Sequence, residues 1–333
     1  MQFKQFGLLI VITILVILFS LTAPNFLSTD NLLSVISGMV IVTIVAIGIT
    51  FSLSVDGFDL SVGSTVTLSN AVIISLFVWH GMNFGLSIML TLTVALVVAL
   101  INLILIIKFK IPDLYATLAT MFIVEGIALT YAEGGSISQG MTRENGAATT
   151  GKIPDAFKVL SEPIPLIIIM FIIVALTYVL LHRTNPGRIM YMIGDNKHAV
   201  EFGGIKTTKY IIISYLASAF FACIGGILLA SQVSSAQVNS GSGYLMTAVA
   251  AAFIGATVSK SGKPNIIGTF LGALLIAILE NGLVMLSVPY YGLNIIKGLV
   301  LAGALIINYA QFKQRRLKRV TYHSEVPATQ QSI

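Results

Sequence analysis

Long runs of apolar residues alternate with short polar segments along almost the whole chain. A helix needs about 20 mainly apolar residues to cross the hydrocarbon core of a bilayer. Ten runs approach this length, at residues 6–21, 32–53, 60–79, 84–107, 114–132, 163–181, 210–230, 244–258, 264–286 and 293–310. The pattern therefore predicts an all-α, polytopic membrane protein with about ten transmembrane helices.

Composition strengthens this prediction. Of the 333 residues, 56% are hydrophobic and 10% are charged, against roughly 45–50% apolar and about 25% charged residues in soluble domains. A water-soluble fold is excluded, and the polar stretches are too short for a separate folded module. We expect a single transmembrane domain over residues 1–312 and a basic tail over residues 313–333.

The positive charges indicate how the chain lies in the membrane. Lys and Arg residues accumulate in cytoplasmic loops of membrane proteins. If the amino terminus is cytoplasmic, only Arg143, Lys152 and Lys158 of the loop residues lie outside, out of 19 Lys and Arg in all. Both termini are then cytoplasmic. The net charge of +6 comes from short loops and the tail, which indicates membrane orientation and not nucleic-acid binding.

Two positions suggest an internal repeat. Asn102 lies near the end of an apolar run and precedes Pro112 and a further run, and Asn281 precedes Pro289 and a further run in the same way. With a cytoplasmic amino terminus, the run that contains Asn102 crosses the membrane inward, and the run that contains Asn281 crosses it outward. Opposed halves of this kind are typical of inverted repeats in transporters, so we predict an inverted repeat.

Three ionisable side chains lie within the apolar runs, at Glu125, Glu280 and Lys297. Each costs roughly 2.5–3.5 kcal/mol near the centre of a span unless it has a partner, water or a function. Glu280 and Lys297 fall at similar depths in consecutive spans. We expect them to form a structural ion pair; the alternative is a polar patch on a transport pathway.

Residues 55–64 place two carboxylates, two glycines and two hydroxyls between long apolar runs. Glycine releases the backbone from helix, and freed backbone groups are tolerated at membrane depth only beside protein or a water-filled cavity. Such a break suits hydroxyl-rich cargo. The alternative is an ordinary turn in which Asp59 caps the next helix.

The loop between the sixth and seventh spans predicts a short exposed helix. Asp195 or Asn196 can cap its start, and Gly203 or Gly204 can end it. A transporter without its own energy source needs a rigid lever against a soluble motor subunit, and a capped surface helix can supply one. In the ninth span, Gly268 and Gly272 permit close helix packing.

Several chemistries find no support in the sequence. There is no G-x-x-x-x-G-K-[ST] loop for phosphate and no H-E-x-x-H motif. The four histidines are scattered, and the single cysteine, Cys223, lies inside an apolar run. We expect no ATP hydrolysis by this chain, no metal site and no cofactor, so the chain is not expected to be an enzyme.

Several segments together carry a resemblance to a known family. They are GFDLSVGS at 57–64, Pro112 with TLAT at 117–120, the loop 187–205, the segment 243–255 and GTFLGA at 268–273. Through them the chain resembles the membrane permease subunits of bacterial binding-protein-dependent ABC importers. The branch concerned carries ribose and other monosaccharides and is related to the branched-chain amino acid permeases.

The resemblance implies a type II-like importer permease in the bacterial inner membrane that works by alternating access. Its expected partners are ABC ATPase subunits, a second permease chain, identical or homologous, and a periplasmic or lipid-anchored sugar-binding protein. The loop expected to dock on the ATPase contains Arg188, Gly194, Asp195, Asn196, His198, Ala199, Glu201 and Gly204. The residues expected to line or support the substrate route are Asp59, Ser61, Ser64, Thr117, Thr120 and Glu125.

Two other functions remain open at this point. One is a branched-chain amino acid permease of the same architecture, although the segment DLSVGS at 59–64 favours sugar. The other is an ion-coupled secondary transporter in which Glu125 or Asp59 relays protons or binds sodium. Comparing uptake of labelled ribose with uptake of labelled leucine distinguishes a sugar permease from an amino acid permease. Dependence of uptake on ATP or on an ion gradient distinguishes an ABC importer from a secondary transporter.

Overall fold

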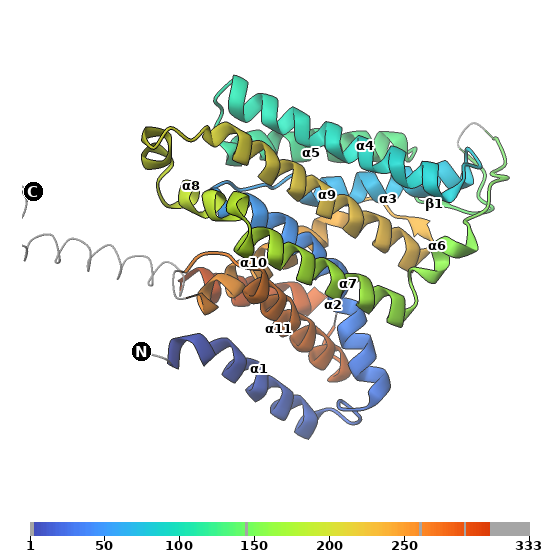
Figure 1. The fold of residues 1–333 in the computed structure, drawn as a ribbon. Coiled ribbons are helices and arrows are strands. Elements are labelled where there is room, and N and C mark those ends of the chain that lie inside the picture. The colour runs from blue at the N-terminus through green and yellow to red at the C-terminus, as the bar shows by residue number, and fades with distance from the viewer. Residues whose placement is uncertain (1–2, 144–145, 260–261, 290, 307–333) are drawn as a thin grey trace, which may run out of the picture.

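The computed structural model describes residues 3–143, 146–259, 262–289 and 291–306, which form a bundle of helices (Figure 1). The prediction of an all-α protein is confirmed, since the two strands in the described part of the chain have two residues each. The elements are α1 (Phe3–Thr22), α2 (Thr29–Ser54), α3 (Val62–Val78), α4 (Phe84–Leu103), η1 (Ile104–Lys108), α5 (Asp113–Tyr131), β1 (Ile137–Ser138), α6 (Asp155–Val159), α7 (Pro163–Tyr178), η2 (Val179–Arg183), α8 (Asn185–Phe202), α9 (Thr207–Val233), β2 (Ser235–Ala236), α10 (Ser240–Val258) and α11 (Ile266–Met285). One further helix, Tyr291–Ile306, follows α11.

An apolar helix lies at each of the ten predicted runs. Within the described residues, seven helices are long and apolar enough to cross a membrane, and three shorter apolar helices occupy the first, third and last runs. α4 and α7 each continue into a π-helical turn, η1 and η2. The end of the last run, residues 307–310, and the predicted tail, residues 313–333, lie outside the described residues.

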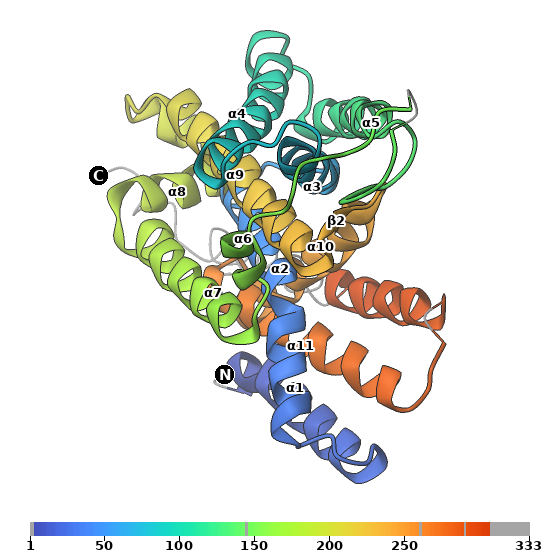
Figure 2. The same cartoon turned by 90° about the vertical axis from the view of Figure 1, so that its right-hand side faces the viewer.

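The bundle has two distinct ends. Figure 1 shows α8 and the start of α1 at one end, and α6 with β1 at the opposite end. α2 and α9 run through the middle of the bundle, and Figure 2 shows the other helices arranged around them. We call the two ends the α8 end and the α6 end.

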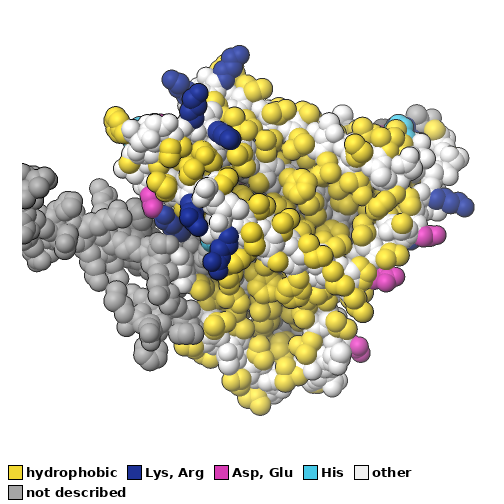
Figure 3. Space-filling model, in the orientation of Figure 1, with side chains coloured by type: hydrophobic (Ala, Val, Ile, Leu, Met, Phe, Trp, Pro, Cys, Tyr) yellow, Lys and Arg dark blue, Asp and Glu magenta, His cyan; other side chains and the backbone are white. Residues whose placement is uncertain are grey.

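The surface fits a protein that crosses a bilayer. In Figure 3, hydrophobic side chains cover the middle of the visible face, Lys and Arg gather mainly at the α8 end, and Asp and Glu lie mostly at the α6 end. Large apolar side chains on α1, α5 and α7 are exposed, among them Ile14, Phe122 and Ile172. A soluble monomer rarely shows so wide an apolar surface, whereas lipid solvates it without cost.

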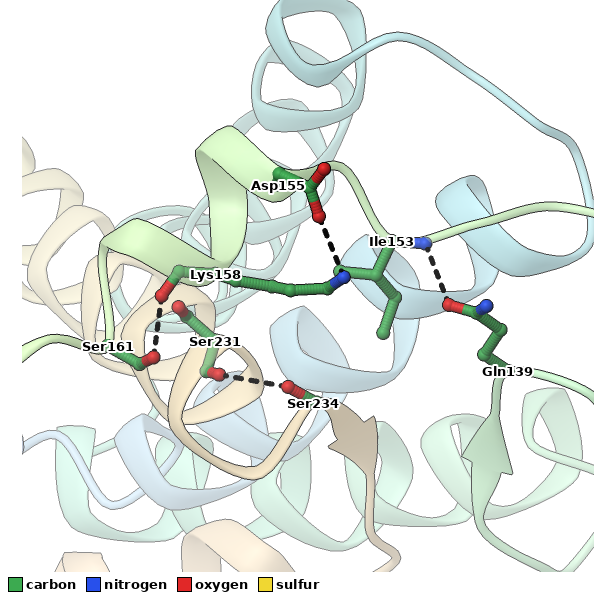
Figure 4. Close-up of polar contacts among 7 residues, drawn as sticks. All are labelled: Gln139, Ile153, Asp155, Lys158, Ser161, Ser231 and Ser234. Carbon is green, nitrogen blue, oxygen red and sulfur yellow. Dashed lines mark hydrogen bonds and ion pairs between the residues drawn. The ribbon is translucent and has the colours of Figure 1, made fainter.

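The chain between α5 and α7 folds over the α6 end. β1 pairs with β2 in antiparallel fashion, with Ile137 opposite Ala236. The Ser231 hydroxyl of α9 donates to the backbone carbonyl of Phe157 at 2.6 Å, which fastens α6 to the end of α9. Figure 4 shows the neighbouring contacts in this segment, including the Lys158–Asp155 ion pair at 2.9 Å.

Helices α10 and α11 cross at almost backbone contact. A Cβ atom on Gly255 would lie 2.2 Å from the carbonyl carbon of Gly268, and one on Gly272 would lie 2.2 Å from the Ala251 carbonyl oxygen. Side chains at these positions have no room. The small residues predicted to permit close packing therefore lie at a helix–helix contact.

Gly255→Ala is expected to destabilise the protein, because the new methyl group forces the two helices apart. Overpacking of this kind costs roughly 1–3 kcal/mol. The measurement is the Tm of the detergent-purified protein. Gly243→Ala on the same helix is the matched control, since its Cβ would meet nothing within 4 Å. An equal Tm for both variants would contradict the close contact.

Candidate functional site

The segment between α2 and α3 interrupts the helical bundle. Residues 57–59 belong to neither helix nor strand, and Asp56 before them has a left-handed backbone with φ of 61°. A Cβ on Gly57 would lie 2.8 Å from the Tyr215 hydroxyl oxygen, so a side chain there would force its neighbours to shift. Asp59 is 2% exposed. The segment is therefore a break inside the packed bundle, and Asp59 also accepts from the Ser61 amide just before α3, as the alternative of a capping turn expects.

Asp59 is the centre of a buried hydrogen-bond network. Its Oδ1 atom accepts from the Ser61 amide at 3.0 Å and from the Ser61 hydroxyl at 2.6 Å. Its Oδ2 atom accepts from the Ser218 hydroxyl of α9 at 2.7 Å. The Asn102 amide of α4 donates to the Ser61 hydroxyl at 2.7 Å. The carboxylate therefore connects the start of α3 to α9 and, through Ser61, to α4.

α5 holds the same segment from its other side. The Phe58 amide donates to Asp113 Oδ2 at 2.9 Å, and the Leu60 amide donates to Thr117 Oγ1 at 3.1 Å. The Tyr215 hydroxyl also donates to Asp113 Oδ2, at 3.1 Å. Two of the backbone N–H groups that leave the helix here are thus satisfied by side chains of α5.

The residues predicted for the substrate route occupy two different settings. Five are at most 4% exposed inside the bundle, namely Asp59, Ser61, Ser64, Thr117 and Thr120. Asp59, Ser61 and Thr117 belong to the contacts described above, and none of the five lines the two cavities described below. Glu125 is only partly buried on α5, and no hydrogen bond or ion pair is found for it among the described residues.

Sequence reasoning did not find the partners of this segment. Asp113, Tyr215 and Ser218 were not predicted as site residues, although Asp113 follows Pro112 directly at the start of a span. An aspartate in a first helical turn is common and has no distinctive pattern. The signal that could have identified it is the need for a partner for Gly57 to Leu60, once these residues leave the helix.

A cavity of about 270 Å³ lies between α2, α10, α11 and the helix Tyr291–Ile306. Its lining is mostly apolar, with Ser34, Thr247, Glu280 and Asn281 as polar members. The Glu280 carboxylate lies 2.7 Å from the Lys297 ammonium, which is the pairing expected from their depths.

Asn281 also connects two of the helices that line this cavity. It exchanges two side-chain hydrogen bonds with Asn31 at the start of α2, at 3.0 and 3.1 Å. This reciprocal amide pair connects α2 to α11 beside the cavity. Because its members are 250 residues apart, the sequence alone gave no sign of it.

α8 contains the predicted short helix. Its backbone is non-helical at Asn196, with φ of −163°, so a second short helix begins there. The Asn196 side chain accepts from the Ala199 amide at 3.1 Å, as a helix cap does. Gly203 ends the helix, and Gly204 follows with φ of 79°.

Most residues predicted for ATPase docking are exposed on this element: Arg188, Asp195, Asn196, His198, Ala199, Glu201 and Gly204. Gly194 lies deeper, and a Cβ there would come within 2.6 Å of the Ser54 carbonyl oxygen at the end of α2. Phe202, which the sequence analysis did not single out, is 93% exposed at the end of α8.

Two further contacts hold α8 against the bundle. The Tyr191 hydroxyl donates to the Pro264 carbonyl at 2.7 Å, and Lys263 forms an ion pair with Asp195. Pro264 and Lys263 belong to the connection between α10 and α11. α8 is therefore fixed both to the end of α2 and to this connection.

A cleft of about 590 Å³ lies at the α8 end, between α8, α9, the start of α5 and residues 55–57. Asp56, Asp113 and Asp195 line it together with Lys110 and Lys197. Partial burial and the nearby Asp113 carboxylate raise the pKa of Asp56 above its ordinary value. The cleft places charged side chains directly beside the break between α2 and α3.

Residues 31–308 match the family described as "Branched-chain amino acid transport system / permease component". The chain is 33% identical to the ribose import permease protein RbsC of Haemophilus influenzae, over 92% of this chain and 93% of that protein. It is 34% identical to RbsC of Bacillus subtilis, over 92% of each chain. It is also 32% identical to the autoinducer 2 import system permease protein LsrD of Photorhabdus temperata, over 91% and 89%. No solved structure matches.

Proposed function

The chain belongs to the family of permease components of the branched-chain amino acid transport system, and from this premise we propose that it is the membrane permease subunit of an ATP-driven importer for a monosaccharide such as ribose. The observation that carries the proposal is the similarity to ribose import permeases over nine tenths of both chains. Because that similarity is not confined to one motif, it covers the helices that would form a route as well as the surfaces that would meet partners.

The energy for transport comes from other subunits. The sequence holds no phosphate-binding loop, so ATP hydrolysis falls to a partner ATPase. A second permease chain, identical or homologous, completes the transporter, and a periplasmic or lipid-anchored sugar-binding protein delivers the solute. The chain would lie in the bacterial inner membrane with both termini and α8 in the cytoplasm, as the distribution of Lys and Arg favours.

The short helix at the end of α8 is the docking element for the ATPase in this proposal. Residues 197–202 project from the bundle and end in an exposed Phe202, which suits insertion of an aromatic ring into a groove of a partner. Gly194 packs against the end of α2 and the Asp56 backbone, so a displacement of α8 would reach the break between α2 and α3 directly.

The experiment is uptake into proteoliposomes that contain this permease, its ATPase and its binding protein. We expect ATP-dependent accumulation of labelled ribose, no accumulation of labelled leucine, and no effect of an ionophore. Leucine uptake would favour the amino acid permease, and uptake that survives without ATP but fails with the ionophore would favour a secondary transporter. Either result would contradict the proposal.

A further inference from the structure

We propose that the cavity between α2, α10, α11 and the helix Tyr291–Ile306 is a binding site for the sugar on its way through the permease, with Glu280 as the principal acceptor of its hydroxyl groups. This inference rests on the proposed function and adds a location and a set of contacts to it. Four observations carry it: the position, size, polarity and charge of the cavity.

The cavity lies in the half of the bundle nearer the α6 end. Its α2 residues, Ser34 to Val42, come soon after the start of that helix, and its α11 residues, Ala273 to Val284, come towards the end of that helix. Thr247 of α10 also lines it. A solute entering from the α6 end would therefore meet this site before it reaches the middle of the bundle.

The size selects the class of solute. A volume of about 270 Å³ is roughly nine times the share of one water in the liquid. One sugar ring fits such a space and a folded peptide does not. The apolar lining residues, such as Val35, Met39 and Ile276, offer surfaces to the C–H faces of a ring.

The polar lining presents acceptors. The Ser34 hydroxyl donates to the Asp30 carbonyl at 2.9 Å, and the Thr247 hydroxyl donates to the Gly243 carbonyl at 2.9 Å. Each hydroxyl thus donates its proton to a carbonyl of its own helix, so its oxygen lone pairs remain available to accept from another donor. A solute rich in O–H donors complements this lining, whereas a lipid acyl chain does not.

Among the described residues that line this cavity, Glu280 carries the only charge. The carboxylate has about four acceptor positions, and Lys297 is its one ion-pair partner in the described part of the chain. The two side chains remain 31% and 25% exposed. Because the Glu280 side chain is partly exposed and lines the cavity, its carboxylate keeps acceptor positions for a further donor.

The first test fills the cavity. Gly38 lines it, and a Cβ there would meet nothing within 4 Å, so Gly38→Leu can enter the space without moving α2. In the complete complex we expect ribose uptake to fall at least tenfold while ATP hydrolysis stimulated by the loaded binding protein persists. Gly7→Leu on α1 is the matched control, also with open space around its Cβ. Uptake at the wild-type rate in Gly38→Leu would overturn the proposal.

The second test separates binding from structure at the ion pair. The exchange Glu280→Lys with Lys297→Glu restores opposite charges, so it should restore the Tm that Glu280→Lys alone lowers. We expect the exchange variant still to import ribose at least tenfold more slowly than wild type. Full recovery of both Tm and uptake would show a purely structural pair and would overturn the site.

The wild-type complex separates this inference from the proposed function. If wild type imports no ribose, the proposed function fails. If wild type imports ribose and both the filled and the exchanged variants do so at the same rate, the proposed function stands and the cavity site alone is rejected.

Discussion

Asp59→Leu is expected to prevent accumulation of folded permease. The substitution removes the acceptor for three donors at once, the Ser61 amide, the Ser61 hydroxyl and the Ser218 hydroxyl. Each buried donor left without a partner costs about 1–3 kcal/mol, and the sum approaches the whole stability of a typical domain, about 5–15 kcal/mol. The measurement is the yield of monodisperse protein after detergent extraction, together with its Tm.

Two further variants show whether the loss of stability in Asp59→Leu comes from the lost hydrogen bonds. Asp59→Asn keeps one oxygen acceptor for Ser61, and the Ser218 hydroxyl can turn to accept from the new amide, so we expect an intermediate loss of stability. Ser64→Ala is the control, because the Ser64 hydroxyl donates only to the Ser61 carbonyl at 2.9 Å in its own turn. If Asp59→Leu were as stable as Ser64→Ala, the network would not hold the segment in place.

Replacing residues 198–201 with glycine and serine is expected to abolish the ATP hydrolysis that the loaded binding protein stimulates. Glycine and serine remove the stiffness of the short helix that Asn196 caps, and a flexible tether cannot transmit displacement. Insertion into the membrane should be unchanged, because this segment lies outside the apolar runs. We expect at least a tenfold loss of stimulated hydrolysis and of uptake in the reconstituted complex.

A single substitution at the same element sharpens this test. Phe202→Asp places a charge where an exposed aromatic ring would enter the ATPase, so it should weaken assembly of the complex, measured by co-purification. Lys158→Ala, an exposed position at the opposite α6 end, is the surface control and should assemble normally. Normal coupling after replacement of residues 198–201 would reject the docking role, whatever the effect of Phe202→Asp.

The helices could be predicted from the sequence because lipid imposes a simple requirement on every span. The α2 and α11 runs, for example, differ from the observed helices by only a few residues at each end. The cap at Asn196 was also predictable, since capping is local and depends on the next three residues. The all-α fold and the short helix of α8 therefore followed from local pattern.

The contacts of the candidate site could not be predicted in the same way. Asp59 was singled out from its neighbours, but its partner Ser218 is 159 residues away and looks like any other small residue in a span. Glu280 and Lys297 were predictable as a pair because charges in lipid are rare and need partners. Serines, threonines and asparagines carry a smaller penalty than charges, so their presence in a span does not by itself indicate a specific partner.

The bond between Ser218 and Asp59 has a consequence for biosynthesis. At about 5–20 residues per second, the ribosome needs roughly 8–30 s to make the chain between these two positions. For most of that interval α3 has already been synthesised, while the carboxylate just before it lacks its partner from α9. Until α9 is made, the Asp59 carboxylate lacks the hydrogen bond from Ser218. A chain whose translation stops before α9 would therefore be a target for membrane proteases.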